Sequence, residues 1–146
     1  MLRDPSLIPL SSEHHDGLAM CVLTRRALAN DASAGNIERL AQKVALRFEV
    51  QLANHFQVEE EVLFPVCGPL PLVKELMAEH QELLALVDRL RAAPSAYLLE
   101  QICERLTTHI RREERELFEH IQRVIPREIL DRTGKEIDRR SRKVCL

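Results

Sequence analysis

Histidine and glutamate residues recur along this chain at spacings that suit a metal centre. The segment HFQVEEE places His55 four residues before Glu59, and HIRREER places His109 four residues before Glu113. Residues four apart lie on one helix face, about 5–6 Å from each other, so each pair can address one metal centre. With the single histidines of two other segments, the candidate ligands are four imidazoles and two carboxylates: His14, His55, Glu59, His80, His109 and Glu113.

This set of donor atoms restricts the kind of metal. Four nitrogens with two carboxylates suit borderline metals such as iron, manganese or zinc rather than calcium. Burying these groups without compensation would be unfavourable, so cations are expected among them. Two carboxylates on facing helices can bridge a pair of ions. Without metal, Glu113 would lie poorly solvated on an apolar stripe, so its removal from the metal-free protein is expected to change stability little.

The positions of proline and glycine predict the elements that carry these residues. Only 11 of the 146 residues are glycine or proline, and they cluster, while residues that favour helices dominate elsewhere. Because proline is poorly tolerated inside a helix, the chain divides into long segments at about 12–30, 36–64, 71–92 and 95–125 and a shorter one at 126–141. We therefore expect an all-α protein, an antiparallel up-down-up-down four-helix bundle with a short C-terminal helix.

Apolar residues at helical spacing support this prediction and locate the site. In the third segment, a stripe of Val73, Leu76, Leu83, Val87 and Leu90 includes His80 at the same spacing. The other candidates interrupt similar stripes. In an up-down-up-down bundle all six fall towards the same end, which apolar packing alone does not require.

Several neighbours compete for the ligand positions. His15 is the alternative to His14, which is favoured because it shares a helix face with Leu18 and Cys21. Glu114 is the alternative to Glu113, and Glu60 could also contribute. His120 is expected to be an ordinary residue near the end of the bundle.

Length and composition indicate one domain, residues 1–146, with the bundle at about 11–125 and a tail at 126–146. The 45% apolar and 30% charged residues exclude wholesale disorder, and no apolar run is long enough to span a membrane. The net charge of −2 gives no bias towards nucleic acid or anionic membranes. Without an export signal, we expect a cytoplasmic protein with reduced thiols, Cys67 filling a turn, and a solvated basic tail.

Four motifs resemble those of the hemerythrin-like HHE cation-binding domains. They are SSEHH at 11–15, HFQVEEEVLFP at 55–65, EHQELL at 79–84 and HIRREERELF at 109–118, and the resemblance covers residues 11–125. It implies a four-helix bundle with a non-haem di-iron centre. Carried over by position, the implied ligands are His14, His55, Glu59, His80, His109 and Glu113, with Glu59 and Glu113 as bridges.

The chain departs from the oxygen-carrying hemerythrins. Those have a second histidine four residues after the first on the third helix, where this chain has Leu84. Their last helix uses an Asp five residues after the histidine, whereas Glu113 here stands at four. With fewer imidazoles, reversible oxygen carriage is disfavoured. A ferritin-like site is disfavoured too, because no histidine has a glutamate three residues before it.

The leading hypothesis is a di-iron protein that binds or senses dioxygen or related small molecules. The alternatives are a di-iron peroxidase or oxidase, for which no catalytic residue is assigned, and an interaction module with a structural metal. Two iron ions are expected, with manganese or zinc as substitutes. The expected partners are small molecules such as dioxygen, peroxide or nitric oxide, with a homodimer as an option, and neither nucleic acid nor membrane.

Overall fold

The computed structural model describes residues 2–141, and in this range the chain consists of helices and short connections, without a strand. A short 3₁₀ turn, Pro5–Leu7, leads into α1 (Ile8–Asn30). The second long segment joins α2 (Ala34–Arg47) to α3 (Ala53–Val58) through a π-helical turn, Phe48–Leu52. It continues through a second π-helical turn, Glu59–Leu63, and a 3₁₀ turn, Phe64–Cys67.

The C-terminal half repeats this plan. After α4 (Pro71–Ala92), α5 (Ala96–Arg112) passes through a π-helical turn, Glu113–Leu117, into α6 (Phe118–Val124). A last helix, α7 (Arg127–Arg140), follows Pro126. The segments that follow the α1–α2 and α4–α5 connections begin at serine caps. The hydroxyl of Ser33 accepts from the N–H of Asn36, and that of Ser95 from the N–H of Leu98.

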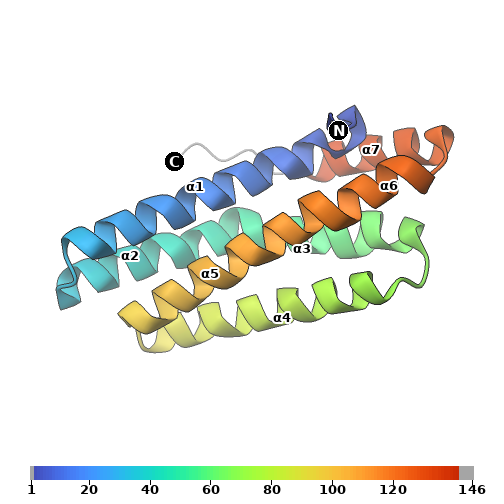
Figure 1. Ribbon diagram of the computed structural model, residues 1–146. Coiled ribbons are helices and arrows are strands. Elements are labelled where there is room, and N and C mark those ends of the chain that lie inside the picture. The colour runs from blue at the N-terminus through green and yellow to red at the C-terminus, as the bar shows by residue number, and fades with distance from the viewer. Residues whose placement is uncertain (1, 142–146) are drawn as a thin grey trace.

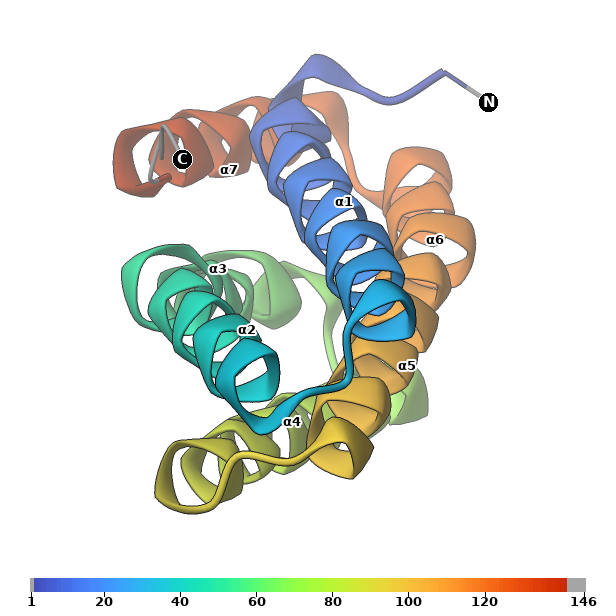
Figure 2. The same ribbon diagram turned by 90° about the vertical axis from the view of Figure 1, so that its left-hand side faces the viewer.

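The long segments pack side by side as a bundle, which confirms the all-α prediction (Figure 1). Contacts join α1 to α2, α2 to α4, α4 to α5, and α5 back to α1. The four segments therefore surround one core, as the end-on view in Figure 2 shows.

Two prolines expected to lie outside helices are inside helical segments. The first helix begins at Ile8 rather than near residue 12, because Pro9 occupies its first turn, where a backbone N–H has no helical partner. The second segment extends through Pro65, which lies in the first turn of Phe64–Cys67. Both differences follow from the tolerance of a helix start for proline.

The last helix, α7, packs against the 3₁₀ turn Pro5–Leu7 and the π-helical turn Glu59–Leu63. Gly134 allows this contact, because a Cβ atom at this residue would lie 2.5 Å from Cβ of Ser6. Leu130 and Ile137 bury their side chains beneath it. The expected solvated tail is therefore a packed helix up to Arg140, and its end, 142–146, lies outside the described residues.

The apolar core is divided into two clusters. One, which we call the loop-end cluster, gathers around Cys21, Val44, Leu99 and Leu106, near the α1–α2 and α4–α5 connections. The other, the α7-end cluster, includes Leu10, Leu63, Leu76, Leu117 and Ile137. Along each long segment, a histidine stands between residues of the first cluster and residues of the second. A polar layer thus separates the two apolar clusters.

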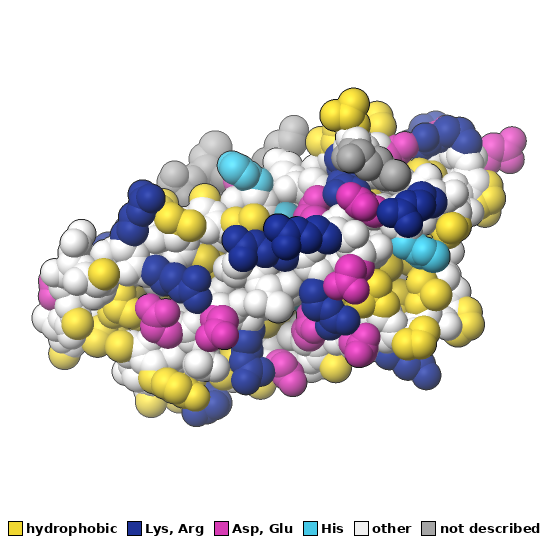
Figure 3. All heavy atoms as spheres, viewed as in Figure 1, with side chains coloured by type: hydrophobic (Ala, Val, Ile, Leu, Met, Phe, Trp, Pro, Cys, Tyr) yellow, Lys and Arg dark blue, Asp and Glu magenta, His cyan; other side chains and the backbone are white. Residues whose placement is uncertain are grey.

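The outer surface carries charges of both signs. Basic and acidic side chains intermingle on the face shown in Figure 3. Among the described residues, no helix is both long and apolar enough to cross a membrane. Burial raises the pKa of the Cys67 thiol to about 11, so this thiol stays protonated at neutral pH.

Candidate metal centre

The structure brings all six sequence-predicted ligands together in the polar layer. Each is at most 2% exposed. They form two groups of four that share both carboxylates, and the donor atoms of each group lie within 4.8 Å of one another. We call them the N-terminal group, His14, His55, Glu59 and Glu113, and the C-terminal group, Glu59, His80, His109 and Glu113.

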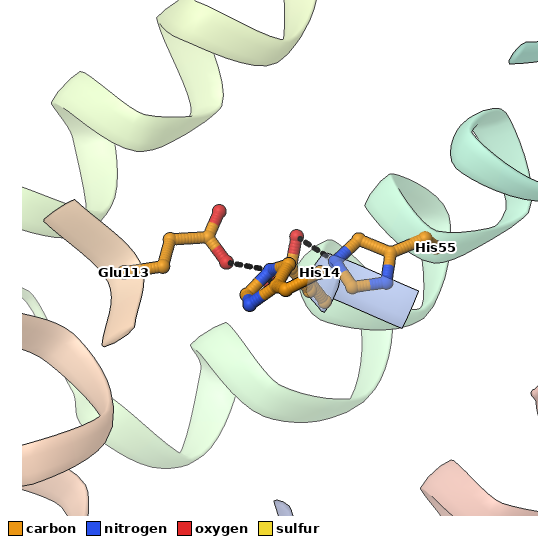
Figure 4. A group of neighbouring side chains, drawn as sticks. His14, His55 and Glu113 are labelled. Carbon is orange, nitrogen blue, oxygen red and sulfur yellow. Dashed lines mark ion pairs between the residues drawn. The ribbon is translucent and has the colours of Figure 1, made fainter. Parts of the chain in front are cut away.

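In the N-terminal group, the imidazoles of α1 and α3 face the carboxylates from two sides. Nε2 of His14 lies 3.3 Å from Oε2 of Glu113 and 3.7 Å from Oε2 of Glu59. Nε2 of His55 lies 3.3 Å from Oε1 of Glu59. Figure 4 shows His14 between Glu113 and His55, with the three side chains converging from separate segments. The Nε2 atoms therefore point into the group.

The C-terminal group has the same design. Nε2 of His80, on α4, lies 3.2 Å from Oε1 of Glu59 and 3.4 Å from Oε1 of Glu113. Nε2 of His109, on α5, contacts Oε1 of Glu113. Each carboxylate thus faces imidazoles of both groups.

Both shared carboxylates stand where the helix widens. Glu59 begins the π-helical turn Glu59–Leu63, and the N–H of Phe64, five residues on, donates to its carbonyl. Glu113 begins Glu113–Leu117 in the same way, with the N–H of Phe118 as donor. Single π-helical turns are often found at functional sites, and here they occur at equivalent positions in the two halves.

Unpaired polar atoms converge on this site, which tests whether the residues fit a metal. The buried atoms without a hydrogen-bond partner include Nε2 of His14, His55 and His109, both carboxylate oxygens of Glu59, and Oε2 of Glu113. Buried polar groups are normally satisfied, so an orphaned set of this size calls for a ligand. Imidazole nitrogens and carboxylate oxygens are the donors that iron, manganese and zinc prefer, and the residues fit such ions.

The outward nitrogen of every imidazole donates to a further glutamate. Nδ1 of His14 lies 2.6 Å from Glu114, and Nδ1 of His55 lies 3.1 Å from Glu13. Nδ1 of His80 lies 2.7 Å from Glu60, and Nδ1 of His109 lies 2.7 Å from Glu79. These bonds hold Nδ1 as the protonated nitrogen and leave Nε2 free to bind a metal.

Without a bound cation, the surrounding carboxylates favour protonated imidazoles. Burial opposes the charge, but hydrogen bonds and charge interactions with Glu59 and Glu113 outweigh it, raising the pKa of His80 to about 10. Burial likewise opposes the charge of His109, but Glu113 and Glu79 raise its pKa to about 9. Burial would raise the pKa of Glu113, yet the positive charge of His109 holds it well below its usual range. The site therefore holds compensating charges.

A glycine lets two of the ligand-bearing helices approach closely. Gly17 stands one turn after His14 on α1, and a Cβ there would lie 3.2 Å from Cδ1 of Ile110 on α5. Between α4 and α5, a cavity of about 390 Å³ reaches the outer side of the site, where Glu79 and His109 line it.

The alternatives left open by the sequence occupy different environments. His15 is exposed and points away from the site, and His120 is half-buried outside both groups. Glu60 and Glu114 contact imidazoles rather than the centre of a group. The sequence predictions did not include Glu13 and Glu79. Their signal is that each directly precedes a candidate histidine, in the dipeptide EH.

A helical bundle with two buried His–Glu groups defines a metal-binding protein. The family model described as hemerythrin HHE cation binding domain matches residues 10–121 and, in a second match, residues 71–139. The chain belongs to this family. Comparisons with curated proteins and with solved structures gave no match.

Proposed function

We propose that this protein holds a non-haem di-iron centre that binds or senses dioxygen or a related small molecule, such as peroxide or nitric oxide. The observation that carries the proposal is the sharing of Glu59 and Glu113 between two groups of buried donors. His14 and His55 would complete one ion, and His80 and His109 the other. When bound, iron would supply reversible redox chemistry and open positions for an oxygen-containing ligand.

The side chains around the site would shield it from water and hold the imidazoles in place. Apolar and aromatic side chains exclude water from the centre. The ring of Phe56 stacks on His80 with centroids 4.1 Å apart, and Phe118 stacks on His14 at 5.3 Å. Two imidazoles and two shared carboxylates would hold each ion, and such a set would leave room for an exogenous small molecule on the metal.

Anaerobic loading with Fe(II), followed by exposure to oxygen, tests the proposal. We expect two irons per chain and an absorption band in the near ultraviolet that appears only after oxygen is added. A colourless protein that holds one inert ion would support a structural metal instead. Steady-state turnover of hydrogen peroxide by the same sample would support the enzymatic alternative.

A further inference from the structure

The four outer glutamates connect the helices in a closed cycle. Glu13 of α1 accepts from His55 of α3, and Glu60, at the end of the same long segment, accepts from His80 of α4. Glu79 of α4 accepts from His109 of α5, and Glu114, which follows α5, accepts from His14 of α1. Each segment thus orients the imidazole of the next, and the last orients the first.

The cycle of contacts corresponds to a pattern that occurs twice in the sequence. Each outer glutamate directly adjoins a proposed metal ligand in the chain. The dipeptide EH occurs at 13–14 and 79–80, and HFQVEE and HIRREE occupy 55–60 and 109–114. Exchanging the two halves therefore maps Glu13 onto Glu79 and Glu60 onto Glu114. The second family match, which begins at residue 71, covers the C-terminal copy of this pattern.

We propose that Glu13, Glu60, Glu79 and Glu114 are positioning residues that act through the imidazoles, and that each serves one metal position. By their contacts, Glu13 and Glu114 serve the N-terminal group, whereas Glu60 and Glu79 serve the C-terminal group. The inference rests on the proposed metal-binding function. A carboxylate on Nδ1 fixes the tautomer and ring orientation and makes Nε2 a better donor.

The surroundings of the four glutamates favour an orienting role over direct ligation. Two are held from outside by arginine. Arg3 donates to Glu114 at 3.1 Å, and Arg112 donates to Glu79 at 2.5 Å. Glutamates that only solubilised the surface or only stabilised a helix would not need to face Nδ1 atoms, yet all four of these carboxylates do. That coincidence is the observation that supports the proposal.

Titration with Co(II), monitored by its visible absorption, tests the role of Glu60. We expect Glu60→Ala to lower the affinity for one of two cobalt ions by about 10–100-fold and to leave the affinity for the other unchanged. Glu61→Ala is the matched control, because Glu61 is the next residue but pairs with Arg140 and touches no imidazole. Glu60→Gln retains an acceptor oxygen and should recover part of the affinity.

Two further measurements separate positioning from a general loss of structure. If Glu60 acts through His80, then adding Glu60→Ala to His80→Ala should not lower cobalt affinity further. In the zinc-loaded protein, ¹⁵N NMR should show Nδ1-protonated imidazoles, and Glu60→Ala should alter the Nδ1–H signal of His80 alone. Helical content by circular dichroism should match that of Glu61→Ala.

The outcomes distinguish this inference from the proposed function. A wild-type protein that takes up no metal would overturn both. A wild-type protein that binds two cobalt ions, alongside a Glu60→Ala variant that binds them equally tightly, would overturn the positioning role alone. Equal weakening of both ions in Glu60→Ala would overturn the assignment of each glutamate to one metal position.

Discussion

Glu59 and Glu113 occupy equivalent places in the two halves of the chain. Each is fully buried, each stands four residues after a histidine, and each begins a π-helical turn. Both carboxylates face imidazoles of both groups, so both groups of donors include them.

Removing a shared carboxylate should therefore have a different effect from removing an imidazole. We expect His80→Ala to retain the ion of the N-terminal group, whereas Glu113→Ala should retain fewer ions than His80→Ala. Metal analysis of protein loaded anaerobically with stoichiometric Fe(II) measures this. Saturation of the wild-type protein at one iron per chain would contradict the proposal of two ions.

Metal loading should release protons. At pH 7, the carboxylates that raise the pKa of His80 to about 10 and that of His109 to about 9 keep these two imidazoles charged in the metal-free protein. The pKa values of His14 and His55 are also raised by the neighbouring carboxylates. An imidazole must be neutral at Nε2 to bind a metal, so we expect His80 and His109 to release about two protons on loading, with any further release coming from His14 and His55. A pH-indicator titration with Zn(II) in weak buffer measures the release. A value near zero would show that the imidazoles are already neutral.

Stability of the metal-free protein should depend on pH. The folded-state pKa of His80 is about 10 and that of His109 about 9, above the unfolded value of about 6.5. The resulting stabilisation is complete below pH 6.5 and is lost as pH rises through 9 to 10. Urea unfolding should show that the free energy of unfolding falls between pH 6.5 and 10. The fall should be smaller in His80→Ala. Metal-linked stability should instead be lost in acid, as protons displace the ions.

The metal-free protein should also depend on Glu113. The sequence places this residue on an apolar stripe, where its loss would matter little, but the structure surrounds it with His14, His80 and His109. At pH 7, Glu113→Ala should lower unfolding free energy by about 3–5 kcal/mol, because it leaves buried cations uncompensated.

Leu99→Ala is the comparison, since this fully buried leucine lies in the loop-end cluster. It should lower stability by about 2–5 kcal/mol through lost burial and a cavity. Its effect should be the same at pH 7 and pH 10, whereas the effect of Glu113→Ala should shrink at pH 10. Equal pH dependence of the two variants would contradict the charge compensation.

Two glycines provide a test of how α7 is attached. In Gly134→Ala, the new Cβ would meet Cβ and Cα of Ser6 at 2.5 and 2.7 Å, so the backbone must shift. We expect a loss of about 1–3 kcal/mol in unfolding free energy. Gly35→Ala meets nothing within 4 Å and should stabilise α2 by about 0.5–1 kcal/mol. If both variants have the same free energy of unfolding as the wild type, Gly134 and Ser6 are not in close contact.

The positions of proline and glycine predicted the helical segments. Spacing within these segments predicted the six central residues, because periodicity within one helix determines which residues share a face. His55 and Glu59 share a face through their own backbone. The outer contacts were not predictable in the same way. The bond from His109 to Glu79 depends on how far α4 and α5 are rotated and shifted against each other, which local spacing does not encode.

The π-helical turns were missed for a different reason. Each one adds a residue to a turn, which changes the face presented by the residues that follow it. The turns Glu59–Leu63 and Glu113–Leu117 are rich in good helix formers and contain no glycine or proline that would mark such a change.

The division of the core by the polar layer has a consequence for folding cooperativity. The α7-end cluster includes residues from both ends of the chain, Leu7 and Ile137, and it is separate from the loop-end cluster. Without ions, the clusters are separated by a layer of polar side chains, which would let the α7 end open separately, as a local unfolding unit. Ions bound there would join the two clusters into one cooperative unit. Amide exchange in α7, far along the chain from any ligand, would then report whether the centre is loaded.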